Sequence, residues 1–383
     1  QMEPLPVDKS TVFAAIDRAT ADVEYMHNVT ERTAWIDSTR HDFLAWSILF
    51  GPDDGAKKIS YGTMVHEKMI KQLVDGGHAM SAVMNHAPVD PMKCAKETVL
   101  DCVAGKYRSY SGHCNNVMRP SWGACHEPMK RLLPALYDDD VAAPRSMAID
   151  GSSLPLPTSV SSLFTSHSVT PQDSPVSLLF VQWASFIYDD VVSPLPNHIA
   201  AGRSAPLPCC RSNFAHPECM AIGVNETGCL SYSRTLPASL DACMVGRREQ
   251  ISTASSFIDA SHIYGVSREE AQRLRAFRDG QLSMADQSDP LALPRSRGDT
   301  RCKAGVCFDG GSRRMNALPS SAALHTLWMR HHNNIARALK EVNAHWSDEL
   351  LYQESRRIVI AQMQHITYAD FLPILLGREA MTR

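Results

Sequence analysis

Eleven cysteines, gathered in three short-range groups, constrain this chain of 383 residues more than any other feature of its sequence. The groups occupy positions 94, 102, 114 and 125, then 209, 210, 219, 229 and 243, and finally 302 and 307. Zinc–thiolate sites need close pairs of the Cys-x-x-Cys type, and none occurs, so the spacing favours disulfides. The sequence does not assign the pairing within the middle group. The odd count leaves one thiol free or joined to another chain, and the candidates are Cys125, Cys209 and Cys210.

Disulfides persist in oxidising compartments, so the cysteine pattern predicts a secreted protein. Two triplets, Asn28-Val29-Thr30 and Asn225-Glu226-Thr227, match the N-glycosylation pattern and favour the same compartment. The chain starts at Gln1 without an initiator methionine, which suggests processing, and it shows no signal peptide.

Composition argues against two broad classes of partner. Hydrophobic residues make up 44% of the chain, charged residues 21%, and the formal net charge is −3, as in an ordinary globular protein. This near-balance of charge gives no electrostatic case for nucleic acid or an anionic membrane surface. The longest apolar run, Ser177 to Tyr188, is shorter than the roughly 20 residues that a membrane-spanning helix needs.

Hydrophobic periodicity predicts a mainly α fold with few strands. One helix is expected to open at Thr170-Pro171, which combine a cap with a first-turn proline. The predicted helical stretches are 10–83, the run from Thr170 through Ile187, 319–343 and 347–368. A proline-containing stretch at 87–91 then divides the chain into a helical N-terminal region, 1–93, and a larger region, 94–383.

Several motifs resemble those of one family, in the same order along the chain. The run YRSYSGHCNN at 107–116 is similar to the YRxxxGxCNN signature of the animal haem peroxidases, the superfamily of myeloperoxidase and peroxidasin. Further similar motifs are LPALYDD (133–139), QW (182–183), SFIDASHIYG (256–265), LHTL (324–327) with HN (332–333), LYQE (351–354), ITY (366–368) and LP (372–373).

The resemblance implies that residues 94–383 form the N-terminal portion of a disulfide-stabilised, helical animal haem-peroxidase-like domain. Residues 1–93 resemble the helical propeptide region of that family in place and character. Two short loops closed in the family match the pairs Cys102–Cys114 and Cys302–Cys307, so the resemblance implies these disulfides.

The apolar run QWASFIYDD at 182–190 ends in three ionisable groups where the family has QWxxxxDHD. In the family the first acid esterifies the haem, the histidine is the acid and base for peroxide, and the second aspartate binds calcium. Here those places hold Tyr188, Asp189 and Asp190, and the distal glutamine of the family is replaced by Ser185. The resemblance therefore implies that the catalytic imidazole is absent.

The other haem contacts of the family are similarly reduced. Its catalytic arginine matches Arg314, which could equally be a structural ion-pair partner. Its second ester-forming carboxylate matches Ala317, and the sulfonium-forming methionine of myeloperoxidase matches Leu318. Covalent haem attachment is thus not expected, and haem itself is doubtful.

The exchange at position 189 matters because peroxide cleavage needs a base that takes a proton and returns it near neutral pH. Imidazole has an ordinary pKa of about 6.5 and suits both steps, whereas a carboxyl with a pKa of about 3.9 is a weak base. Asp189 is consequently a poor replacement for histidine.

Calcium ligands, by contrast, are retained. The family's calcium set matches Asp190, the hydroxyls of Ser255 and Ser261, the carbonyl of Phe257 and the carboxylate of Asp259. Calcium takes six to eight oxygen ligands in flexible geometry, so these donors are chemically suitable. The resemblance implies a calcium site.

The family's proximal histidine lies in a motif beyond the segment matching Leu372–Gly377, and no such motif occurs here. A second chain that supplies the remaining half of the fold is therefore expected, with a possible interchain disulfide.

Two functional hypotheses follow. The first is a secreted, calcium-binding peroxidase homologue without peroxidase activity, which has a structural role or carries a hydrophobic ligand such as a pigment. The second is an atypical haem peroxidase that uses Asp189 and Arg314 distally and a histidine of the partner chain. A metal site at His325, His331 and His332 is the less favoured interpretation, since packed and hydrogen-bonded roles suit these residues better.

Overall fold

The computed structural model describes residues 7–33, 53–86, 102, 105–165, 176–199, 205–224, 228–239, 246–285, 292–294 and 307–381. Its helices are α1 (Lys9–Thr33), α3 (Asp54–Asp75), α4 (Met80–His86), α5 (Pro157–Thr165), α6 (Leu178–Val191), α7 (Ser261–Tyr264), α8 (Arg268–Arg273), the 3-10 helix η1 (Arg313–Asn316), α9 (Pro319–Val342), α10 (Asp348–His365), the π-helix η2 (Ile366–Phe371), α11 (Leu372–Leu376) and α12 (Arg378–Met381). The predicted mainly α fold is confirmed.

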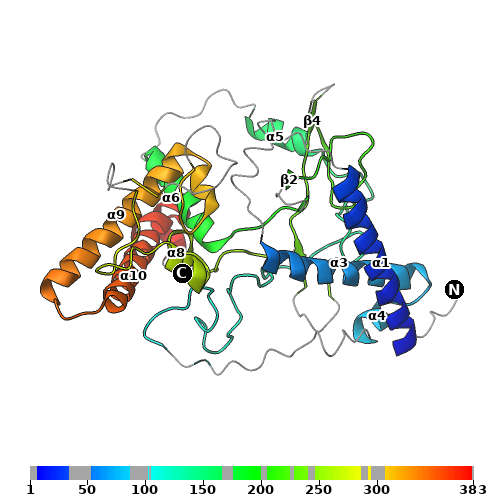
Figure 1. Ribbon diagram of the computed structural model, residues 1–383. Helices are drawn as coiled ribbons and strands as arrows, with labels where there is room; N and C mark the ends of the chain where they lie inside the picture. The colour runs from blue at the N-terminus through cyan, green and yellow to red at the C-terminus, as the bar shows by residue number, and fades with distance from the viewer. Residues whose placement is uncertain are drawn as a thin grey trace.

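Strands are short and pair only locally. Within the described residues they form three two-stranded antiparallel sheets: β1 (His198–Ile199) with β2 (Ala205–Pro206), β3 (Ile222–Val224) with β4 (Gly228–Leu230), and β5 (Pro237–Ala238) with β6 (Glu249–Gln250). Helices gather at two ends, α1, α3 and the short α4 at one and α6, α9 and α10 at the other, with loops and these strands between them (Figure 1).

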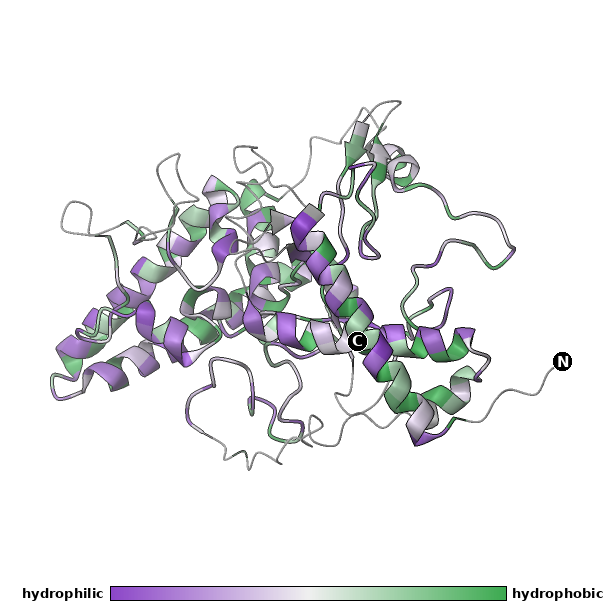
Figure 2. Cartoon of the chain, turned by 45° about the vertical axis from the view of Figure 1, so that its right-hand side comes forward, coloured by the Kyte–Doolittle hydropathy of each residue, from purple (hydrophilic) through white to green (hydrophobic). Residues whose placement is uncertain are grey.

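The N-terminal helices pack on each other and on the rest of the chain. Figure 2 shows both hydrophilic and hydrophobic residues around these long helices, as amphipathic packing requires. Asp53 caps α3 by accepting a hydrogen bond from the amide of Ala56 at 2.9 Å. The buried residues that form this hydrophobic core include Val12, Ala15, Ala19 and Val23 of α1, Met69, Ile70 and Leu73 of α3, and Leu195, Leu236 and Ile251 of the larger region.

A second hydrophobic core joins α6, α9 and α10. The rings of Trp183 and Trp328 lie with their centroids 5.9 Å apart, and Val359 and Met363 are fully buried in the same core. Ser347 caps α10 by accepting from the amide of Leu350 at 3.3 Å. The helices α9 and α10 lie where the sequence predicts them. The prediction that one helix runs from Thr170-Pro171 through Ile187 is wrong, because α6 begins at Leu178 and the preceding Ser177 is extended.

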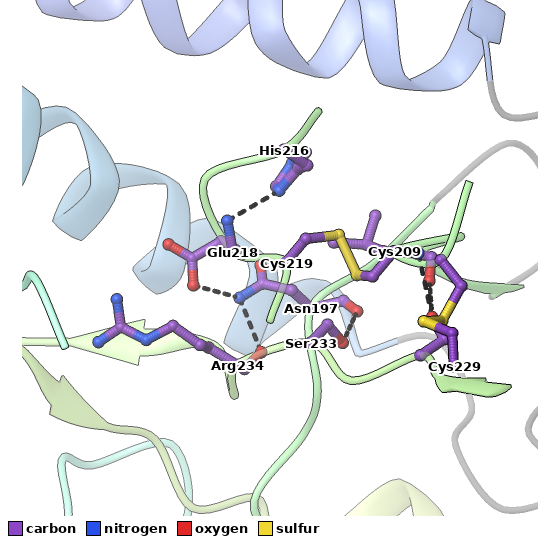
Figure 3. Close-up of a disulfide and its surroundings, with 11 residues drawn as sticks. Asn197, Cys209, His216, Glu218, Cys219, Cys229, Ser233 and Arg234 are labelled. Carbon is purple, nitrogen blue, oxygen red and sulfur yellow. Dashed lines mark hydrogen bonds between the residues drawn. A yellow bond between two sulfur atoms is a disulfide. The ribbon is translucent and has the colours of Figure 1, made fainter. Parts of the chain in front are cut away.

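Three disulfides have both of their cysteines within the described residues, and they hold irregular segments of the chain. Cys102 bonds to Cys114, and the adjacent cysteines Cys209 and Cys210 bond to Cys219 and Cys229. Figure 3 shows the Cys209–Cys219 bond beside Asn197, whose side-chain amide donates to Glu218 at 3.2 Å and to the carbonyl of Arg234 at 3.0 Å. The alternative that Cys209 or Cys210 is unpaired is therefore wrong.

Cys125 is the free thiol of the described residues, and it is buried. Cys307 is disulfide-bonded, while Cys302 lies outside the described residues, so the implied pair between them stays a prediction. Because Cys125 is only 6% exposed, it is not placed to form a disulfide with another chain.

A buried ion-pair cluster ties α3 to the disulfide-closed segment. The guanidinium of Arg248, 1% exposed, donates to both carboxylate oxygens of Glu218 at 2.8 and 2.6 Å and to Glu67 of α3 at 3.3 Å. Burial raises the pKa of Glu67 to about 7, with Arg248 opposing and Glu218 adding to the shift. This cluster adds a polar contact, between Glu67 of α3 and Arg248, to the apolar packing that joins the N-terminal helices to the rest of the molecule.

None of the helices in the described ranges combines the length and apolar character needed to cross a bilayer.

Candidate functional site

The end of α6 meets the loop at 255–261, and four of the predicted calcium ligands come together there. Asp190, Ser255 and Asp259 are fully buried, and Ser261 is 3% exposed. The Ser261 hydroxyl donates to Asp190 Oδ1 at 2.9 Å, and the Ser255 hydroxyl donates to Asp259 Oδ1 at 2.7 Å. The amide of Ala260 donates to Asp190 Oδ2 at 3.0 Å.

This site brings together two buried carboxylates and one imidazole, that of His262, whose Nδ1 lies 3.0 Å from Asp190 Oδ1, while no lysine or arginine of the described residues is in ion-pair contact with Asp190 or Asp259. Burial, followed by repulsion from Asp190, raises the pKa of Asp259 to about 7. Asp259 Oδ2 is buried and has no hydrogen-bond partner among the described residues. Buried charges of one sign are costly unless a counter-charge compensates them, and a hard cation liganded by carboxylate and hydroxyl oxygens would do so. The residues present therefore fit calcium.

The loop backbone is shaped for this arrangement. Ala260 lies at φ 60° and ψ 33°, a left-handed conformation that a residue with a side chain adopts at a cost of about 1–3 kcal/mol. The turn sends the amides of Ala260 and Ser261 toward the two carboxylates, the second donating to Asp259 Oδ1 at 3.2 Å. Phe257, whose carbonyl is the fifth predicted ligand, is half-buried in the same loop.

Asp189, which directly precedes Asp190 on α6, forms an ion pair with Arg314. The Arg314 guanidinium donates to Asp189 Oδ1 at 3.3 Å and to the carbonyl of Pro194 at 3.2 Å. Burial raises the pKa of Asp189, and Arg314 lowers it. The pair lines a cavity of about 150 Å³, small beside the roughly 300–1,000 Å³ of typical ligand pockets.

Sequence reasoning missed His262, which lines the same cavity. Its imidazole is fully buried, with Nδ1 3.0 Å from Asp190 Oδ1 and its ring centroid 4.2 Å from that of Phe186. The signal was available: this histidine directly follows the predicted ligand Ser261, at a variable place of the SFIDAS motif. An imidazole thus does reach this region, but from the loop and not from α6.

The remaining haem-pocket equivalents lie on an open surface. Ser185, Ala317 and Leu318 are exposed, and Tyr188 is 46% exposed with its ring centroid 5.7 Å from the Arg314 guanidinium carbon. Neither Tyr188 nor Ala317 carries a carboxylate, so the residues present do not fit a covalently held haem.

The exposed haem-pocket equivalents continue into an apolar surface, called here the open apolar face. On α6, Leu178, Val181, Ser185 and Tyr188 follow one another at spacings of three or four residues and share one side of the helix. The ring of Phe180 contacts that of Phe371 at 4.7 Å and brings α11 alongside. The large apolar residues of the open apolar face are Leu178, Leu179, Val181, Tyr188, Leu318, Ile374, Leu375 and Leu376, each 46% or more exposed.

The histidines of α9 are packed and hydrogen-bonded. His325 Nδ1 pairs with the carbonyl of Ser321 at 2.8 Å, His331 with Gln362 at 2.8 Å, and His332 with Tyr264 and the carbonyl of Gly280 at 2.9 Å each. Burial lowers the pKa of His325 to about 3 and that of His332 to about 4. Within the described residues no group of three or more His, Cys, Asp or Glu is arranged to hold a metal.

Of the two glycosylation triplets, Asn28 lies exposed on α1, and Asn225 falls outside the described residues.

Comparison with known proteins identifies the class. The family model described as animal haem peroxidase matches residues 107–383. The chain is 36% identical over 295 residues to chorion peroxidase of Aedes aegypti, covering 72% of this chain and 37% of the relative, and 33% identical over 310 residues to myeloperoxidase of Mus musculus, covering 73% and 42%.

Among solved structures, peroxidase A of Dictyostelium discoideum matches with a TM-score of 0.51 and 23% identity over 70% of this chain and 53% of that one. A fatty acid alpha-dioxygenase of Arabidopsis thaliana matches with a TM-score of 0.51 and 14% identity over 98% of this chain and 50% of that one. These likenesses show the fold. The chain belongs to the animal haem peroxidase family, and it spans 20–38% of the length of the first three curated relatives it matches.

Proposed function

We propose that this chain is part of a secreted, calcium-braced peroxidase homologue that has lost peroxide chemistry and serves a structural or hydrophobic-ligand-carrying role. Family membership and the disulfides support a secreted peroxidase scaffold. The loss of activity is the finer part of the proposal and depends on the distal residues.

The ion pair of Asp189 and Arg314 is the observation that carries it. In a working distal site the base must be free to take a proton, and the cation must be free to stabilise developing negative charge. Here each side chain is engaged by the other at 3.3 Å in a mostly buried place. Separating them would leave two poorly solvated charges unpaired, which is costly. The ion pair therefore stabilises the fold, and it leaves neither side chain free to act on peroxide.

Calcium would have a structural role in this scaffold. Asp190, Ser255, Asp259 and Ser261 would hold it, joining the end of α6 to the loop at 255–261, and the metal would neutralise the two buried carboxylates. The proposed ligand set includes the Phe257 carbonyl as a fifth oxygen.

A second polypeptide segment, on a partner chain or elsewhere in the protein, would cover the open apolar face. Large contiguous apolar surfaces on a folded protein mark sites of association or ligand binding. The limited coverage of the relatives supports a fold that needs further residues. A hydrophobic ligand held between that segment and α6 would occupy the same surface.

The test is the absorbance spectrum of the native assembly, purified with whatever segment accompanies this chain, together with a peroxidase assay. We expect no Soret band and no turnover above a protein-free control. A broad visible band from a different chromophore would support the carrier role. A Soret band with peroxidase activity would refute the proposal.

The second candidate, an atypical haem peroxidase, has one observation in its favour. Asp189, Arg314 and the imidazole of His262 all line one cavity. A Soret band that persists in a His262→Ala variant while turnover disappears would favour this candidate over the first.

A further inference from the structure

A second cavity, which shares no lining residue with the one at Asp189 and Arg314, has several basic side chains in its wall. It has a volume of about 220 Å³ and lies between the loop at 106–108 and α10. Four of its lining residues are cations: Lys106, Arg108, Arg356 and Arg357. No role in the family chemistry discussed above uses them.

Arg356 is the central residue of this basic cavity, and it is 3% exposed. Its guanidinium donates to the backbone carbonyls of Arg108 at 2.8 Å and Ser109 at 3.2 Å, and its carbon lies 4.3 Å from the ring centroid of Tyr110. Nε has no hydrogen-bond partner among the described residues, and no described carboxylate lies within ion-pair distance of this side chain. A buried guanidinium held only by neutral groups lacks a counter-charge.

The other three cations add to this excess. Lys106 pairs with Glu354, and Arg357 lies 3.7 Å from the same carboxylate. Arg108 stands with its guanidinium carbon 5.4 Å from the ring centroid of Phe257, a cation–π contact. Four cations against the single carboxylate of Glu354 leave three positive charges around the cavity. The carboxylate of Asp259 interacts with Arg356 and Arg108 through space, without an ion-pair contact to either, and it belongs to the proposed calcium site.

We propose that this cavity binds a sulfate- or phosphate-type oxyanion. Arginine presents planar, forked donors that match such groups, and clusters of arginine and lysine recognise them wherever they occur. The volume is below that of pockets for drug-sized ligands, so it suits a single oxyanion group and not a large cofactor. Two sources share this chemistry: free inorganic ions and sulfate groups carried on a sugar chain.

The most direct variant, Arg356→Gln, would also release the loop carbonyls that Arg356 holds and is expected to impair folding. The decisive variant is therefore the double substitution Arg108→Gln and Arg357→Gln, because both side chains are exposed. The matched control is Arg337→Gln, an exposed arginine on α9 outside the cavity.

Isothermal titration of the purified protein with sodium sulfate, sodium phosphate and a sulfated oligosaccharide, at constant ionic strength set by chloride, measures binding. We expect saturable binding that the double variant weakens by about tenfold or more, equivalent to roughly 1.4 kcal/mol, with the control unchanged. Circular dichroism checks that each variant is folded.

The arms of the experiment separate the two sources. Tighter binding of the oligosaccharide than of free sulfate, lost in the double variant, assigns the site to sugar-borne sulfate, and equal binding assigns it to the free ion. Absence of saturable binding by any of the three, or binding that the folded double variant retains in full, would overturn the proposal.

Discussion

At the scale of single residues, the distal region of this peroxidase homologue is defined by one exchange. Asp189 occupies the position at which the family motif has a histidine, and its carboxylate forms an ion pair with Arg314. The neighbouring Asp190 instead accepts hydrogen bonds from Ala260 and Ser261 of the loop at 255–261, where we propose that calcium binds. Two adjacent carboxylates on one helix thus have different partners: Asp189 pairs with Arg314, and Asp190 bonds to the loop at 255–261.

Replacing Asp189 with asparagine should destabilise the protein by about 1–3 kcal/mol, because the mostly buried Arg314 then lacks a counter-charge. Urea unfolding would measure this. The matched control is Asp140→Asn, whose pair with Arg247 is largely exposed and should matter by less than about 0.5 kcal/mol. An equal loss in free energy of unfolding in both variants would show that the Asp189–Arg314 pair stabilises the fold no more than an exposed ion pair does.

Glu67 gives a pH-dependent prediction at the same scale. Its folded pKa of about 7 lies above its ordinary 4.5, so the folded state holds a proton that the unfolded chain releases. The contribution of this proton to the free energy of unfolding is therefore complete below pH 4.5 and is lost as the pH rises to 7. Glu67→Gln should therefore gain stability over the parent across that window, by about 1–3 kcal/mol at its top. Arg248, Glu218 and Arg234 are the charged groups that face Glu67.

Denaturant unfolding at several pH values tests this, with the exposed Glu269→Gln as control. The difference between the control and the parent should stay constant with pH. If the difference in free energy of unfolding between Glu67→Gln and the parent also stayed constant with pH, the raised pKa of Glu67 would be contradicted.

At the scale of elements, local signals predicted α9 and α10 well. Their apolar faces repeat at three and four residues, Pro319 occupies the first turn of one, and Ser347 caps the other. The same reasoning identified α6 as apolar but could not say that Leu178 and Val181 face outward. When a helix is apolar on two sides, its periodicity does not show which side packs in the core and which side is left exposed for a partner.

The meeting of the proposed calcium ligands could be predicted only through the family motif. The spacing of Ser255, Asp259 and Ser261 marks a loop with alternating donors, but nothing local connects that loop to Asp190, some 70 positions away. The pairing of Cys209 with Cys219, and the meeting of Arg248 with Glu67, are likewise long-range outcomes that only the assembled fold determines.

Calcium should stabilise the junction of α6 and the loop at 255–261. At a calcium concentration 100 times the Kd, linkage predicts a gain of about 2.7 kcal/mol over the chelated protein. Thermal unfolding with and without a chelator measures it. Asp259→Asn should abolish the calcium response, while Asp150→Asn, an exposed carboxylate away from the site, should retain it. An unfolding temperature that is the same with calcium and with the chelator would contradict the proposed site.

At the scale of the whole molecule, the open apolar face is the feature that most needs a partner. Val181→Asp should leave the isolated chain folded, because Val181 is already 57% exposed, but should prevent association with the segment that completes the fold. Val342→Asp, at a position 77% exposed at the end of α9, is the control. Native mass spectrometry of the assembly would compare them. Unimpaired association of Val181→Asp would exclude this face as the contact.

The shared core of the N-terminal helices bears on how the protein would respond to proteolysis. Val12 and Met69 lie in one cluster with Leu195 and Ile251, and Glu67 reaches the guanidinium of Arg248. A single cut near position 90 would break the backbone without undoing either set of contacts. The two fragments should therefore migrate together on a sizing column and separate only under denaturing conditions.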